Sequence, residues 1–128
     1  MSSIFSKIIA GEVPSYKIYE DERTYAFLDI DQATRGHVLV VPKVEVDKIY
    51  DLEDEDYEAL MATVKKLSRH MEGVLETRIL WKVIGTDVPH AHVHLLPYDP
   101  DWNSMHAQEP VELPAEEMVE LQDKLALE

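Results

Sequence analysis

Cysteine is absent from this chain of 128 residues. Its absence excludes disulfides and thiolate metal sites, and it is typical of cytoplasmic proteins. Basic residues are few, since 12 Lys and Arg stand against 26 Asp and Glu and give a formal net charge of -14. A long polyanion such as DNA needs a basic footprint, so nucleic acid is not expected as a partner. A small phosphorylated ligand is compatible with this charge, because a local pocket can be positive on an acidic protein.

Long hydrophobic runs are also missing. A membrane-spanning helix needs roughly 20 consecutive apolar residues, so no membrane association is expected. The opening segment, MSSIFSKIIAGEVPSYK, has neither a basic leader nor an apolar run of the length of a signal peptide. No repeat or linker divides the chain. Hydrophobic residues make up 45% and charged residues 30%, and the length suits one domain spanning residues 1–128.

Periodicity and turn residues predict an α+β domain. An apolar period of three to four residues and acids in the first turn indicate a long helix over 54–75. Five segments rich in β-formers indicate a mostly antiparallel five-stranded sheet, the first two as a hairpin. The predicted strands are 15–20, 24–29, 36–42, 78–85 and 89–97, with a short helix or turn over 3–11 and a C-terminal helix over 114–127.

Three of the six histidines recur at alternate positions in VPHAHVHLLP, residues 88–97: His90, His92 and His94. Side chains alternate between the faces of a strand, so the three imidazoles are predicted to share one face. Neighbouring members would be ~7 Å apart along the backbone. Neutral imidazole is a nucleophile, a general base and a metal ligand near neutral pH.

Three interpretations follow from this spacing alone. The histidines could simply lie on the surface of an edge strand, although their apolar flanks disfavour this. They could bind a metal ion, because His-x-His on a strand is a sound zinc-ligand spacing. They could also perform phosphate chemistry with one histidine as the nucleophile. Spacing does not separate the last two interpretations.

The wider sequence resembles the histidine triad (HIT) family. HAHVHLL, residues 90–96, matches the family pattern of three alternating histidines followed by two apolar residues. Independently, IFSKIIAGEVPSYKIYEDERTYAFLDIDQATRGHVLVVPK, residues 4–43, is similar to the opening of bacterial HIT proteins. The resemblance covers about residues 4–97 and leaves 98–128 as a variable tail. It implies a HIT-like α+β fold and a homodimer with a shared sheet.

The resemblance also implies an enzyme, a bacterial-type nucleotide hydrolase or transferase. Its substrates would be nucleotide conjugates, either phosphoramidates or dinucleoside polyphosphates, cleaved at the α-phosphate through a nucleotidyl-histidine intermediate. Two alternatives are a non-catalytic nucleotide-binding module and a zinc-dependent phosphohydrolase that uses the triad as ligands. No cofactor or metal is required by the nucleophilic mechanism.

Site residues are carried over from the family pattern. His92 takes the place of the nucleophile, while His90 and His94 would orient it and bind phosphate oxygens. His37 matches a fourth family histidine near the triad. Asp29, in FLDI, matches the carboxylate that receives ribose hydroxyls. The apolar wall that holds the base is matched by Ile4, Phe5, Ile8, Phe27 and Ile30.

The sequence departs from the family pattern at the N-terminus. Many bacterial members have two cysteines that help to bind a structural zinc, where this chain has Ser3 and Ser6. Serine is a poor zinc ligand, so a structural zinc of that type is not expected.

A second departure lies upstream of the triad, where polar family residues hold phosphate or assist the leaving group. Ile79 stands at the position of an asparagine and Trp81 at that of a glycine. Thr86 and Asp87 stand at the next two polar positions and are assigned to the nucleotide site. In the tail, Trp102 and His106 are candidates for substrate selection, besides the simpler interpretation as a surface loop.

Overall fold

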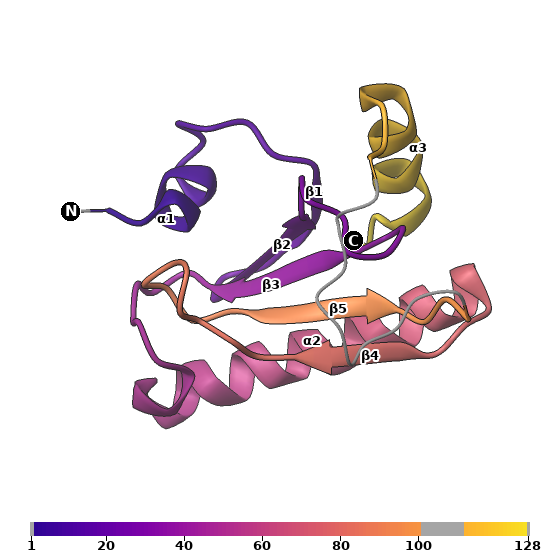
Figure 1. Cartoon of the computed structure of the whole chain (residues 1–128). Coiled ribbons are helices and arrows are strands. Elements are labelled where there is room, and N and C mark those ends of the chain that lie inside the picture. Colours follow the sequence, from indigo (N-terminus) through magenta and orange to yellow (C-terminus); the bar gives the residue numbers. More distant parts are fainter. Residues whose placement is uncertain (1, 101–111, 128) are drawn as a thin grey trace.

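An antiparallel sheet of five strands forms the centre of the computed structural model, which describes residues 2–100 and 112–127. The strand order is β1-β2-β3-β5-β4, so the predicted α+β class is confirmed (Figure 1). The elements are α1 (Ile4–Ile9), β1 (Lys17–Glu20), β2 (Thr24–Leu28), β3 (Val38–Pro42), the 3₁₀ helix η1 (Ile49–Asp51), α2 (Asp54–Leu75), β4 (Ile79–Lys82), β5 (Val93–Pro97) and α3 (Ala115–Leu125).

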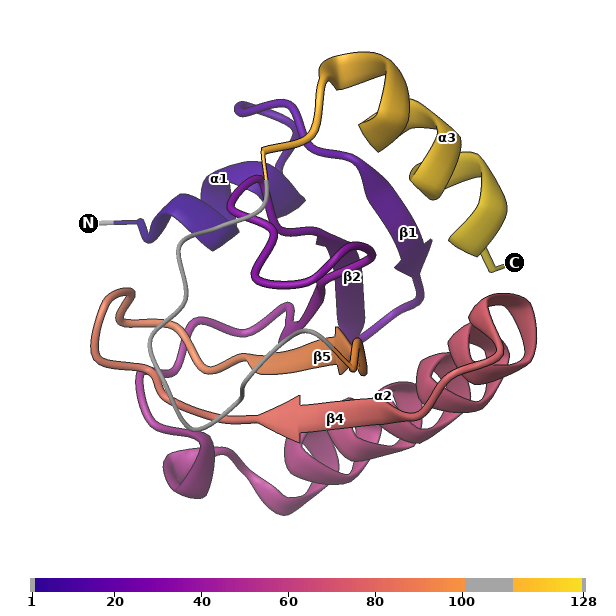
Figure 2. The ribbon, with the colours of Figure 1, turned by 45° about the vertical axis from the view of Figure 1, so that its right-hand side comes forward.

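Both faces of the central strands are covered, and every residue of β2 and β3 is buried. Alternate residues of these strands therefore enter two different cores. Ala26 and Val40 belong to the larger core, which packs against α2 and α3. Tyr25 and Phe27 belong to a smaller core with Phe5 of α1. The long helix α2 runs along one face of the sheet, and α1 lies on the opposite side of the sheet (Figures 1 and 2).

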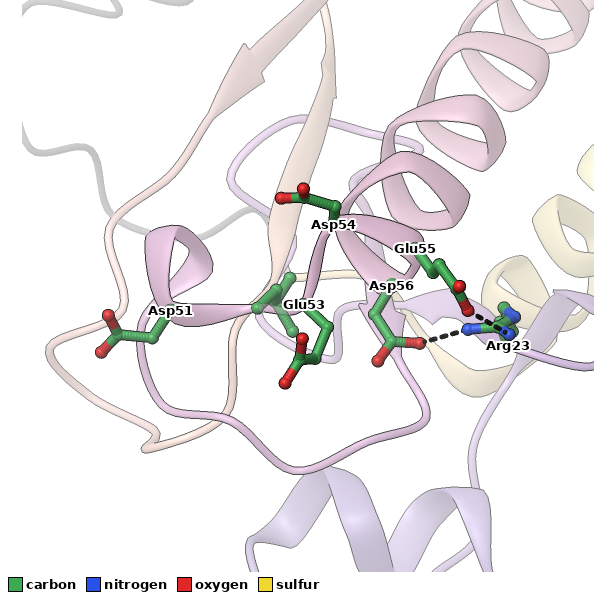
Figure 3. A pocket seen from close by; sticks show the side chains of 7 residues that line it. Arg23, Asp51, Glu53, Asp54, Glu55 and Asp56 are labelled. Atoms are coloured by element: carbon green, nitrogen blue, oxygen red, sulfur yellow. Dashed lines mark hydrogen bonds and ion pairs between the residues drawn. The ribbon is translucent and has the colours of Figure 1, made fainter.

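The long helix α2 has the bounds that its sequence predicts. Three acidic residues occupy its first turn, where the helix dipole favours negative charge. Arg23, in the turn between β1 and β2, pairs with Glu55 at 3.1 Å and with Asp56 at 2.9 Å. These residues line a hollow of about 560 Å³ in which carboxylates predominate (Figure 3). Its charge makes it unsuited to phosphorylated ligands.

The last predicted strand is shorter than expected, which corrects part of the sequence analysis. β5 begins at Val93, so only His94 of the triad lies within the sheet ladder. The preceding residues are extended but have other backbone partners: the N–H of His90 donates to Val88 and that of Ala91 donates to Val46. The ladder ends at the pair of Lys82 with His94 on the β4 side and at the pair of Val40 with Val93 on the β3 side.

Within the described ranges, no helix is long and apolar enough to cross a membrane. Trp102 and His106, the candidates in the tail, lie outside the described residues.

Candidate active site

The histidine segment keeps the predicted alternation although it is mostly outside the ladder. Ala91 and Val93 enter the larger core on the α2 side. His90 and His92 face the opposite side, where both rings contact Phe5 edge-on at centroid distances of 5.8 and 5.0 Å. The triad histidines therefore gather on the face of the sheet that α1 covers.

His90 is fully buried, and both of its ring nitrogens contact the protein. Nε2 lies 2.8 Å from the carbonyl oxygen of Pro42, and Nδ1 lies 2.8 Å from the hydroxyl of Ser3. A carbonyl only accepts, so Nε2 carries the proton and Nδ1 accepts from Ser3. Both ring nitrogens therefore have partners within the chain, which leaves neither of them for the phosphate oxygens that the family resemblance assigns to His90.

His92 is held in the opposite tautomer. Its Nδ1 lies 2.7 Å from the carbonyl oxygen of His90, so Nδ1 must donate. In the neutral ring, the lone pair is then on Nε2. This is the arrangement that a nitrogen nucleophile requires, because the attacking atom carries no proton.

His94 and His37 form a directed pair. The backbone N–H of Ala33 donates to Nδ1 of His37 at 3.1 Å, so the neutral ring carries its proton on Nε2. That Nε2–H donates to Nδ1 of His94 at 2.9 Å. His94 in turn presents an Nε2–H donor. The rings of His92 and His94 are 5.0 Å apart, which lets one small anion reach both.

Burial keeps these imidazoles neutral. Desolvation, reinforced by His94, lowers the pKa of His37 to about 3. Desolvation, reinforced by His92 and then Lys82, lowers the pKa of His94 to about 4. Burial also lowers the pKa of His90. At neutral pH these rings act as fixed hydrogen-bond donors and acceptors and not as cations.

Asp29 lies beside this pair, with its Oδ2 3.6 Å from Nε2 of His37. Burial raises its pKa to about 6, although the N–H of Asp31 donates to it. The loop between Asp29 and His37 is fixed by Gln32, which is fully buried and bonds to the backbone of Asp29, Gly36 and His37. Sequence reasoning missed Gln32, because an isolated amide in a polar loop gives no periodic signal.

The predicted apolar wall is only partly assembled within the chain. Phe5 and Phe27 are buried with their ring centroids 5.6 Å apart, and Ile8 packs against the same small core. Ile4 and Ile30 are outside this core, with exposed fractions of 44% and 78%. Phe5 and Phe27 are therefore part of the small core, whereas the side chains of Ile4 and Ile30 are exposed to solvent.

Upstream of the triad, where the sequence departs from the family pattern, the side chains of β4 alternate between the two faces of the sheet. Ile79 packs against the larger core, away from the histidines. Lys82 pairs directly with His94 in the β4–β5 register, so the two side chains share the histidine face. Its charge helps to lower the pKa of both His37 and His94. Sequence reasoning missed Lys82, because the register of β4 against β5 is not readable from the strand itself.

Beyond His92 the surface opens into a hollow of about 590 Å³. Thr86 and His92 line it together with Tyr50, Val83 and Ile84. Asp87 acts on His94 electrostatically and favours its protonated form. Thr86 and Asp87 thus lie near the triad, and the hollow offers space next to His92.

A metal ion fits the nearest cluster of ligand atoms poorly. Atoms of Asp29, His37 and His94 lie within 4.8 Å of one another. However, the Ala33 N–H occupies Nδ1 of His37, which leaves the proton on Nε2, the nitrogen that faces the cluster. A protonated nitrogen cannot ligate a metal. The geometry suits the observed histidine hydrogen bond better than a cation.

The chain belongs to the HIT family. The HIT domain matches residues 10–101. The chain is 41% identical over 100 residues to Protein hit of Bacillus subtilis, covering 73% of this chain and 69% of that protein. It is 39% identical over 98 residues to adenosine 5'-monophosphoramidase HNT1 of Saccharomyces cerevisiae, covering 73% of this chain and 61% of that protein.

Solved structures agree with this membership. A Hit-like protein from Bartonella henselae, described as involved in cell-cycle regulation, superposes with a TM-score of 0.84 at 26% identity, covering 97% of this chain and 93% of that chain. A zinc-bound histidine triad family protein from Mycobacterium smegmatis gives a TM-score of 0.80 at 26% identity, covering 98% of this chain and 94% of that chain.

The lowered histidine pKa values predict acid sensitivity. The unfolded chain binds protons on His37 and His94 near pH 6.5, whereas the folded chain takes them up only near pH 3 and 4. Stability therefore falls as the pH drops below about 6.5. The raised pKa of Asp29 acts in the opposite sense between about pH 4 and 6, but one carboxyl is outweighed by two imidazoles. Urea unfolding at pH 7, 6 and 5 should show this loss, and His94→Asn should reduce its slope. Equal slopes in both proteins would contradict the assignment.

Proposed function

We propose that this protein is a nucleotide hydrolase of the phosphoramidase type, which cleaves the bond between the α-phosphorus of a nucleotide conjugate and its leaving group. The unprotonated Nε2 of His92, held by the hydrogen bond from Nδ1 to His90, is the observation that carries the proposal. The name of the yeast relative, adenosine 5'-monophosphoramidase, supports the same reaction class. A purine nucleoside phosphoramidase of Escherichia coli is 36% identical over 101 residues.

In the first step, Nε2 of His92 attacks the α-phosphorus. The Nε2–P bond forms, the bond from phosphorus to the leaving amine breaks, and the amine takes a proton from solvent. The ring becomes an imidazolium, whose Nδ1–H donates more strongly to the carbonyl of His90. That carbonyl was already aligned before the reaction, so the developing positive charge is stabilised without rearrangement.

In the second step, water attacks the same phosphorus. An O–P bond forms and the Nε2–P bond breaks, which releases the nucleoside monophosphate. One proton returns to solvent. His92 regains its neutral form, and the protons of the two steps balance. Splitting one difficult displacement into two easier ones is the advantage of a covalent intermediate.

Two groups beside His92 suit the phosphate oxygens. His94 offers an Nε2–H donor that is oriented by His37. Lys82 brings positive charge to the same face of the sheet. In a chain of net charge -14, this local cation favours an anionic ligand at the site.

The nucleoside is proposed to occupy the face lined by Phe5 and Phe27. The rings offer an apolar floor for the base, and the Asp29 carboxylate beside them would accept the ribose hydroxyls. Exposed Ile4 and Ile30 would close over the bound base. Thr86 would contact the leaving group from the hollow next to His92.

The zinc-dependent alternative is disfavoured by the geometry, because His90 has no free nitrogen and His37 faces the cluster with a protonated one. The binding-module alternative differs from the proposal only in turnover. A cytoplasmic location is a further prediction that rests on the absence of cysteine.

We also propose that the protein forms a homodimer through the β4 edge. β4 is an edge strand of the sheet, and Trp81 within it and Val83 and Ile84 just after it are about half exposed. An apolar edge strand left open is prone to pair with another chain, and a second copy would cover it.

Replacing His92 tests the reaction. His92→Asn retains a polar side chain of similar size but lacks the nucleophilic nitrogen, so turnover of adenosine phosphoramidate should be lost while nucleotide binding persists. A rapid quench of the wild-type protein should trap a nucleotidyl adduct that is labile in acid, on the peptide that carries His92. Near-normal turnover of His92→Asn would exclude the mechanism. Tight binding by the wild-type protein without product would favour the binding module.

Replacing Asp29 tests the ribose contact. Asp29→Ala should weaken binding of adenosine monophosphate by about 1.5–3 kcal/mol, the range for a hydrogen bond to a charged group. Inorganic phosphate, which has no ribose, serves as the control ligand and should bind almost unchanged. Calorimetric titration of both ligands distinguishes a ribose contact from a structural role of Asp29. Equal weakening of binding for the two ligands would indicate the structural role.

Light scattering tests the dimer. The wild-type protein at micromolar concentration should have twice the 14.7 kDa protomer mass. Trp81→Lys, which places a charge on the edge, should shift the population toward monomer. A wild-type protein that is entirely monomeric would refute the proposed edge.

A further inference from the structure

Three polar side chains from distant parts of the chain meet behind His90. Ser3 and Ser6 come from the start of α1, and Glu45 follows β3. Oε1 of Glu45 lies 2.6 Å from both the backbone N–H of Ser3 and the hydroxyl of Ser6. The hydroxyl of Ser3 reaches Nδ1 of His90 at 2.8 Å. We call Ser3, Ser6 and Glu45 the serine clamp.

We propose that the serine clamp positions His90 without a metal ion and thereby fixes the tautomer of His92. The proposal rests on the function proposed above, because it concerns the same nucleophile. The clamp residues would be positioning residues, since neither Ser3 nor Glu45 contacts the free Nε2 of His92.

Every hydrogen in the clamp has one consistent destination. Nε2–H of His90 donates to Pro42, so Nδ1 accepts, and the Ser3 hydroxyl proton must point toward it. The Ser3 oxygen in turn accepts the backbone N–H of Ser6 at 3.0 Å, as a helix N-cap does. The Ser6 hydroxyl proton goes to Glu45. The network is therefore closed within the protein.

A structural zinc does not fit this set of donors. The family resemblance implies a zinc held with the help of cysteines at the positions of Ser3 and Ser6, and one similar structure is zinc-bound. Zinc prefers thiolate, imidazole and carboxylate ligands, whereas two groups here are neutral hydroxyls. The nearest carboxylate oxygen, on Glu45, already accepts two hydrogen bonds. Hydrogen bonds thus join the residues at the positions where the resemblance implies a metal site.

The clamp is linked to the nucleophile through one residue. The carbonyl of His90 accepts Nδ1–H of His92 at 2.7 Å, so a shift of His90 would release the proton that selects the reactive tautomer. Phe5, on the same short helix as Ser6, also contacts the rings of His90 and His92. Loosening the start of α1 would therefore disturb both the hydrogen bond and the packing of the nucleophile.

Glu45 keeps the clamp formed over a wide pH range. The backbone N–H of Ser3, followed by the hydroxyl of Ser6, lowers the pKa of this carboxyl to about 2. The carboxylate is ionised throughout the range in which the enzyme would be assayed. Protonation of Glu45 should therefore not limit the positioning of His90 in this range.

The metal content tests the first half of the proposal. Wild-type protein incubated with zinc and then desalted should retain far less than one zinc per chain, as measured by inductively coupled plasma mass spectrometry. A chelator should leave the turnover of the wild-type protein unchanged. Ser3→Cys/Ser6→Cys supplies two thiolates beside His90 and should retain about one zinc per chain. This variant is the positive control. One zinc per wild-type chain, lost in Ser3→Ala, would overturn the proposal.

Kinetics test the second half. Ser3→Ala removes the donor to His90, so kcat for adenosine phosphoramidate should fall about tenfold, while KM changes by less than about twofold, because the loss lies in positioning of the nucleophile. Ser3→Thr retains the hydroxyl and the N-cap and should restore kcat. Equal loss in Ser3→Ala and Ser3→Thr, or normal kcat in Ser3→Ala, would contradict the clamp.

Side-chain nitrogen NMR gives a test that needs no turnover, so it separates failure of the clamp from failure of the proposed function. Wild-type spectra should show His90 protonated on Nε2 and His92 on Nδ1. In Ser3→Ala the His92 signals should move toward a mixture of both tautomers. If Ser3→Ala fails to fold, Ser6→Ala removes the hydrogen bond to Glu45 and the longer contacts of the Ser6 hydroxyl with Ser3 and His90, but it keeps the Ser3 donor to His90. This variant should give a smaller shift in the same direction. An unchanged His92 tautomer in a folded variant would refute the proposal.

Discussion

The hydrogen bond from Nδ1–H of His92 to the carbonyl of His90 is the interaction on which the site depends. It fixes which nitrogen of His92 is free, and it stabilises the charge that attack would create on the ring. The rest of the structure holds the two ends of this bond. The ring of His90 is anchored on both nitrogens, and Phe5 packs against His92 edge-on. A catalytic constellation of this kind needs support from a surrounding shell of hydrogen bonds and packed side chains.

The sheet makes that shell possible because it is covered on both faces. The larger core with α2 stabilises the strands, so the opposite face is free to carry polar and aromatic groups. β2 and β3, buried throughout, form a rigid base from which His37 and Asp29 project at the ends of the strands. Sites built on such elements are held more exactly than sites on loops. The segment with His90 and His92 and the loop between Asp29 and His37 lie outside the strands. In that loop, buried Gln32 compensates by bonding to the backbone.

The sequence was most informative where structure is local. The period of α2 and its acidic start predicted both ends of the helix correctly, because helical spacing is a property of neighbouring residues. The start of β5 was wrong, because the length of a ladder depends on the strands beside it. His92 was assigned from the family pattern. The hydrogen bonds that fix the ring of His90 come from Ser3 and Pro42, which lie 87 and 48 residues away in the sequence. Lys82 was missed for the same reason, since it meets His94 only through strand register.

Neutral histidines would let an acidic chain bind the proposed phosphate group without a basic surface. A chain of donors starts at the backbone N–H of Ala33, passes through His37 and ends at Nε2–H of His94. Each ring is fixed in one tautomer by the hydrogen bond that it accepts. The backbone N–H of Ala33 therefore determines that His94 carries its proton on Nε2, and no buried cation is needed. Burying charged imidazoles side by side would incur desolvation and mutual repulsion, which lower the pKa of His37 and His94. Lys82, exposed at the end of β4, then supplies positive charge at the rim, where its own desolvation cost is small.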